Sequence, residues 1–204
     1  MSDSAETNRP RVLRAVERIS VGLALGAGVT IALLAVLISV DIIGRDLFGV
    51  SVQGTDEIGG YVLAFVGSLG MALTLMRRGH PRIDLFFRFF PPTMRDALNV
   101  TAQVAIAGFA LFMAWQAWGE LESTLRFGAI TNTPLQTPLW VPQSIWLAGM
   151  VFFALTCCLT SAHALWLFTT DRRAVSRVYG SPTVEDEVGH YVDTAGEGRR
   201  DAGD

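Results

Sequence analysis

Four long apolar stretches dominate this sequence, and they restrict the chain to an all-α integral membrane protein. The stretches cover residues 21–43, 58–76, 98–119 and 143–168. A helix rises about 1.5 Å per residue, so about 20 apolar residues cross a hydrocarbon core about 30 Å thick. Helices in soluble proteins are usually shorter and keep a polar stripe, which these stretches lack. The sequence therefore predicts four transmembrane helices within a membrane domain of residues 21–168.

The distribution of arginine predicts how these spans are oriented. All 16 basic residues are arginine, and most lie in residues 1–20, between the second and third spans, or just after the fourth span. Short arginine-rich loops stay in the cytoplasm, so both termini are expected to be cytoplasmic and the two acidic connections periplasmic. The expected location is the inner membrane of a bacterium. Residues 169–204 form a polar cytoplasmic tail with few large apolar residues, and such composition favours disorder.

An apolar run interrupted by charges lies between the second and third spans. Residues 83–90 are too short to cross a membrane and too apolar to lie in water. A short amphipathic helix in the headgroup plane, with its arginines reaching lipid phosphates, accounts for both properties. Pro91 and Pro92 are expected to end this helix, and Thr93 is expected to cap the third span. Membrane lipid is therefore an expected partner.

Small residues recur at four-residue spacing and predict faces for close helix packing. They are Gly22 and Gly26 in the first span, and Gly60, Ala64, Ser68 and Ala72 in the second. In lipid, small residues matter because they let helix backbones approach each other. Two interpretations stay open: the four spans pack on one another, or one of these faces docks a partner membrane protein.

The connection before the fourth span is rich in proline. Pro134, Pro138 and Pro142 lie within residues 127–142, which favours an extended, stiff loop. Such a loop can dock a soluble partner, or it can be a mere connector, and its composition does not separate the two.

Few residues in the spans could carry chemistry. Asp41 precedes Arg45 by four residues, so the two side chains share a helix face and can pair. A carboxylate within a span can also mark an ion pathway, which leaves open an autonomous oligomeric transporter with Asp41 as its ion site. Another alternative is a haem-bearing membrane anchor of an electron-transfer complex. Only His163 of the three histidines lies within a span, which disfavours this alternative but leaves it open. No catalytic motif, metal-ligand spacing or single basic face is present, so no enzyme activity, cofactor or nucleic-acid partner is expected.

Several short motifs lie along roughly residues 11–168: a segment with His80, Arg82 and Asp84 between the second and third spans, Asp56 with Glu57 at the start of the second, and Pro138 with Trp140 before the fourth. Together they resemble the small permease subunit of tripartite ATP-independent periplasmic (TRAP) transporters, the DctQ-like family. His80, Arg82 and Asp84 are similar to the family's His-x-Arg-Val-Asp-Leu segment, which is the most specific match. Their order, spacing and the four-span count together carry the likeness. The other matching positions are Arg45 at the end of the first span, Asp56 and Glu57 at the start of the second, and Pro138 and Trp140 before the fourth.

The resemblance implies a non-catalytic subunit without transport chemistry of its own. In the family, a larger membrane subunit carries the substrate and couples it to sodium, and a periplasmic binding protein delivers that substrate, usually a small organic acid. The small subunit scaffolds the large permease subunit and helps to form the periplasmic docking face. The matching residues are therefore expected to have structural and interface roles.

Overall fold

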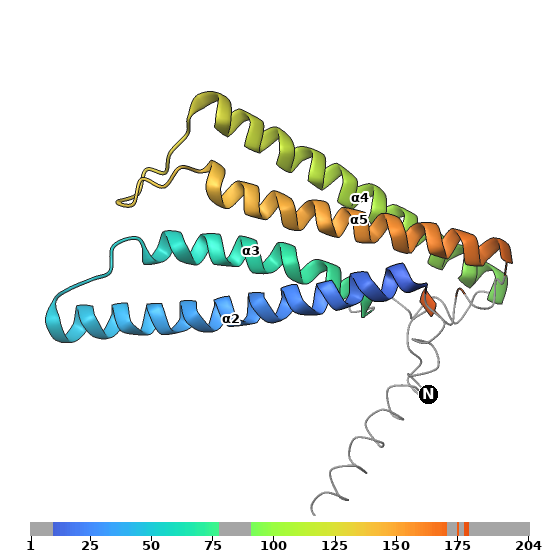
Figure 1. Cartoon of the computed structure of the whole chain (residues 1–204), viewed down its shortest axis with the longest axis horizontal. Helices are drawn as coiled ribbons and strands as arrows, with labels where there is room; N and C mark the ends of the chain where they lie inside the picture. The colour runs from blue at the N-terminus through green and yellow to red at the C-terminus, as the bar shows by residue number, and fades with distance from the viewer. Residues whose placement is uncertain (1–9, 78–90, 171–174, 176–177, 180–204) are drawn as a thin grey trace, which may run out of the picture.

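The computed structural model of the chain describes residues 10–77, 91–170, 175 and 178–179. Within these residues lie four long helices, namely α2 (Arg11–Phe48), α3 (Thr55–Met76), α4 (Pro92–Phe127) and α5 (Trp140–Thr170) (Figure 1). Each of the four is long and apolar enough to cross a membrane, which confirms the predicted all-α, four-span fold. The expected interfacial helix 83–90, with His80, Arg82 and Asp84, and most of the expected tail lie outside the described residues.

Helices α2 and α4 are each bounded by a proline N-cap and a glycine C-cap. Helix α2 has 38 residues and ends at Phe48, and its C-cap Gly49 has a φ of 65°, in the left-handed region where glycine is favoured. Helix α4 follows the N-cap Pro91 and begins at Pro92, and it ends at Phe127 with Gly128 as its C-cap at φ 60°. The expected cap at Thr93 is wrong, because the helix already begins at Pro92, a residue that is favoured in the first turn, and Thr93 therefore lies inside it.

Helix α5 is the central element of the arrangement. Figure 1 shows the helices in the order α2, α3, α5 and α4, and α5 packs on both α3 and α4, whereas α2 packs mainly on α3. Half of the most apolar 18-residue window of α5 is buried (50%), compared with 6% of the corresponding window of α2. Most of the α2 surface is therefore left uncovered by the residues that the structure describes.

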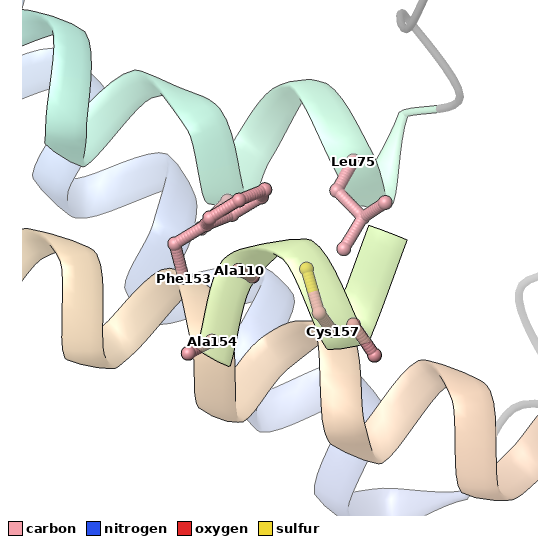
Figure 2. Packing of buried hydrophobic residues seen from close by; sticks show 7 residues of the cluster. Leu75, Ala110, Phe153, Ala154 and Cys157 are labelled. Carbon is pink, nitrogen blue, oxygen red and sulfur yellow. The ribbon is translucent and has the colours of Figure 1, made fainter. Parts of the chain in front are cut away.

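The main core lies where α3, α4 and α5 meet, and it contains many small side chains. Its members are Ala72, Leu75, Ala107, Ala110, Phe153, Ala154 and Cys157, several of them labelled in Figure 2. Near this core, α3 and α5 approach closely at Ser68 and Gly149. A Cβ atom added to Gly149 would lie 2.4 Å from Ser68 Oγ and 2.7 Å from Ser68 Cβ. The absence of a side chain at Gly149 therefore permits this helix contact.

A second cluster joins the far end of α5 to the chain that follows it. Val175 and Tyr179 are buried against Val100 of α4 and against Ala164 and Leu167 of α5. In the same region, Tyr179 OH lies 2.7 Å from Nδ1 of His163, which stacks on Trp166. The first residues after α5 that the structure describes thus pack on the membrane domain.

Candidate functional site

The two described connections between helices lie at the same end of the molecule. Residues 49–54 join α2 to α3, and residues 128–139 join α4 to α5 (Figure 1). We call this the loop end, and it includes the last two turns of α4. The opposite end, where α2 and α4 begin and α3 and α5 finish, is the terminal end. The loop end holds most of the residues that the sequence singled out for partner contacts.

A buried carboxylate anchors the α2–α3 connection to the end of α2. The Asp41 side chain is only 3% exposed and forms an ion pair with Arg45, as the four-residue spacing predicts. Its Oδ1 accepts hydrogen bonds from Ser51 Oγ at 2.9 Å and from the N–H of Val52 at 2.6 Å. We call these four residues the Asp41 clamp. Because both carboxylate oxygens have partners within the chain, this geometry favours a structural role for Asp41 over an ion site.

A second carboxylate holds the α4–α5 connection against the start of α3. Glu57 accepts hydrogen bonds from the hydroxyl groups of Tyr61 and Thr133, and from Thr131 Oγ1 at 2.9 Å. The loop also binds itself, because the N–H of Thr137 donates to Thr131 Oγ1 at 2.9 Å. We call these five residues the Glu57 clamp. Hydrogen bonds donated to a carboxylate favour its charged form, so the clamp keeps a negative charge at the helix N-terminus, where the helix dipole also favours one.

Packing and a tight turn complete the loop end. Gly54 has φ 88°, and a Cβ added there would lie 1.4 Å from Leu135 Cδ1, so the two connections touch. The N–H of Gln136 donates to the carbonyl oxygen of Thr133 at 3.0 Å, which closes a turn with a proline in its second position. An antiparallel bridge pairs Ile130 with Pro138. The connection is thus folded back on itself, unlike the extended loop that its prolines indicate.

The sequence-predicted interface residues occupy different environments at the loop end. Arg45 and Glu57 belong to the two clamps, whereas Asp56 and Pro138 are exposed, and Trp140 is 48% exposed at the start of α5. Sequence reasoning missed the remaining members of the clamps. They are Ser51, Val52, Tyr61, Thr131, Thr133 and Thr137. The repeated threonines were a signal in the loop, but nothing in the sequence tied them to Glu57.

The predicted helix-packing residues divide into two groups. Ser68 and Ala72 are buried within the chain. The other four are exposed, namely Gly22, Gly26, Gly60 and Ala64. A Cβ added to any of the three glycines among them would have nothing within 4 Å in the described part of the chain. Their small faces are therefore open to lipid or to another protein.

The acidic, histidine and cysteine side chains of the described residues do not gather as a metal site would require. Across residues 10–77 and 91–170, no group of three or more such side chains could hold a metal ion. Cys157 and Cys158 are free thiols within α5, with Cys157 buried. At the loop end the described residues instead form a surface whose two connections are held by hydrogen bonds to Asp41 and Glu57.

Comparison with known proteins places this architecture in a family. The family model described as "Tripartite ATP-independent periplasmic transporters, DctQ component" matches residues 34–166. That segment covers about two thirds of the 204 residues and includes both clamps. No curated protein and no solved structure matches the chain. With its four membrane-crossing helices, the chain is a multi-pass membrane component of a transport system, and it belongs to the family of DctQ components of tripartite ATP-independent periplasmic transporters.

Proposed function

We propose that this chain is the non-catalytic small membrane subunit of a TRAP transporter. It holds the large permease subunit as part of a fixed scaffold, and its loop end helps to dock the periplasmic substrate-binding protein. Sodium-coupled uptake of a small organic acid then takes place in the partner subunits. In this arrangement the chain lies in the bacterial inner membrane with its loop end in the periplasm and both termini in the cytoplasm. The family match over residues 34–166 carries the proposal.

Helix α2 is the element we assign to the large subunit. Its most apolar window is only 6% buried within the chain, compared with 50% for α5. Gly22 and Gly26 lie on that uncovered surface, where another helix could approach closely over them. Lipid alone would also cover an apolar helix, so the small residues, rather than the apolar ones, support a protein contact.

The loop end is the surface we assign to the soluble binding protein. Its exposed charged residues are the acids Asp46, Asp56, Glu120 and Glu122 and the cations Arg45 and Arg126. Acidic groups in excess favour a partner that presents basic side chains. Exposed apolar side chains accompany them, with Phe127 78% exposed and Ile130 54% exposed. A mixed polar and apolar surface held rigid by two clamps suits a reversible protein contact.

Purification of the tagged full-length chain from native membranes in mild detergent tests the scaffold role. We expect an equimolar complex with a large, many-span membrane protein, identified by mass spectrometry. Replacing Gly22 and Gly26 together by leucine should lower the yield of that complex, because the bulkier side chains hold the partner helix away. Gly108→Leu is the matched control, since Gly108 is exposed on α4 with open space around it. A chain that elutes only with itself would favour the autonomous transporter, and haem absorbance with a redox partner would favour the electron-transfer anchor.

A photo-crosslinking amino acid at Asn132 tests the docking role. Asn132 is exposed in the α4–α5 connection, between the two clamp threonines Thr131 and Thr133. In intact cells we expect it to crosslink an exported, soluble solute-binding protein. The same probe at Ala15, which is exposed at the terminal end of α2, should not capture that protein. A membrane complex that assembles normally but gives no such crosslink from Asn132 would contradict docking and leave the scaffold role intact.

A further inference from the structure

A small cavity lies at the terminal end, where all four helices come together. Its walls are formed by Leu13 of α2, Leu75 and Met76 of α3, Gln103 of α4, Thr160 of α5, and Val178 and Tyr179. The cavity volume is about 10 Å³, which is close to the smallest space that holds one water molecule. Most of these side chains are apolar, so the few polar atoms on the wall decide what can occupy the cavity.

Gln103 supplies an unsatisfied polar atom to this region. The residue is 3% exposed, and its Oε1 is a buried acceptor without a hydrogen-bond partner. Its backbone carbonyl is already occupied, because Ser161 Oγ donates to it at 2.6 Å. A buried acceptor without a partner destabilises the folded state, and buried polar atoms in proteins almost always have a partner in the protein or in ordered water.

Thr160 supplies the second polar group on the wall. Its hydroxyl group donates to the backbone of α5: Thr160 Oγ1 lies 3.0 Å from the carbonyl oxygens of both Thr156 and Cys157. The lone pairs of Thr160 Oγ1 thus stay available as acceptors. The lining residues that the structure describes therefore include two that carry neutral oxygen acceptors, Gln103 of α4 and Thr160 of α5, besides Tyr179, whose hydroxyl group pairs with His163.

We propose that one water molecule occupies this cavity and donates a hydrogen bond to Gln103 Oε1. Water is a small neutral donor of the size that the cavity admits, and it can satisfy two acceptors at once. Among the described residues that line the cavity none carries a carboxylate, so this part of the wall offers a cation no compensating negative charge. The bound water links α4 to α5. It lies beside Leu13 of α2 and beside Leu75 and Met76 of α3, which line the same cavity. This assignment does not depend on the transport role of the chain.

Two glutamine variants of the full-length chain, compared by thermal unfolding in detergent, test the proposal. Gln103→Met keeps the length of the side chain and removes the acceptor, so the water loses a partner and Tm should fall by about 2–4 °C. Gln143→Met is the matched control, because Gln143 Oε1 is also buried without a partner but does not line this cavity. Its Tm should stay unchanged or rise. A higher Tm for Gln103→Met would overturn the proposal, since that is the effect of removing an acceptor that has no partner.

An experimental map of the unmodified protein that resolves ordered water gives the second, direct measurement. We expect density for a water oxygen about 2.7–3.2 Å from Gln103 Oε1. The assignment of a water molecule would be overturned if the cavity held a side chain or a cation, or if it were empty. This holds whatever the unfolding measurements show.

Discussion

Replacing Gly149 by alanine is expected to destabilise the chain, although the change adds only one methyl group. The new Cβ would lie 2.4 Å from Ser68 Oγ and 2.7 Å from Ser68 Cβ, well inside normal contact distance. Because Ser68 Cβ is fixed to the backbone of α3, the two helices must move apart. Overpacking of this kind costs about 1–3 kcal/mol, and it falls on the central helix of the domain. The midpoint of thermal unfolding in mild detergent should drop accordingly.

The same substitution at Gly108 of α4 is the control, and it should shift stability in the opposite direction. Gly108 is exposed, with nothing in the described residues within 4 Å of an added Cβ. Alanine there only improves helix propensity, by about 0.5–1 kcal/mol. Adding Ser68→Gly to Gly149→Ala should recover most of the lost stability, because it removes the two nearest atoms. Parallel shifts at both glycines, or no recovery in the double variant, would contradict the close α3–α5 contact.

The contact at Gly149 also marks what the sequence could not predict. The four spans follow from apolar length, because bilayer thickness sets how many residues must be apolar. The rotation of each helix does not follow, since spans that are apolar on every side give no periodic signal for a buried face. The spacing of small residues predicted close helix packing at Ser68 and Ala72, which are buried. It predicted the same at Gly22 and Gly26, which are exposed. The same pattern therefore fits a contact within the chain and a contact with another chain.

Sequence separation explains which part of the candidate site could be predicted. The pair Asp41–Arg45 is local, and four-residue spacing on a helix was enough to predict it. The contact from Glu57 to Thr131 spans 74 residues, and it depends on how α3 and α5 sit together. A pattern along one helix carries no information about such a contact. The roles of His80, Arg82 and Asp84 stay predictions, since these residues lie outside the described part of the chain.

Replacing Glu57 by alanine is expected to release the α4–α5 connection from α3. One carboxylate accepts hydrogen bonds from Tyr61, Thr131 and Thr133, and hydrogen bonds to a charged group are stronger than those between neutral groups. Losing all three hydrogen bonds at once should make local opening of the connection easier, and solvent screening at a side chain of intermediate exposure limits the effect to the loop. Amide exchange of Thr137 and Gln136 should then accelerate by about tenfold or more, because their N–H groups exchange when the connection opens locally.

The neighbouring change Asp56→Ala separates the clamp from a general effect of charge. Asp56 is exposed in the same first turn of α3, so its removal takes away the same charge and the same favourable interaction with the helix dipole. Loop exchange should stay near that of the unmodified chain. Equal acceleration in both variants would show that charge at the helix N-terminus, and not the Glu57 clamp, orders the loop. If only Glu57→Ala releases the loop, crosslinking from Asn132 to the soluble partner should weaken, because the docking surface is no longer ordered. The membrane complex should persist, because the α2 face is unchanged.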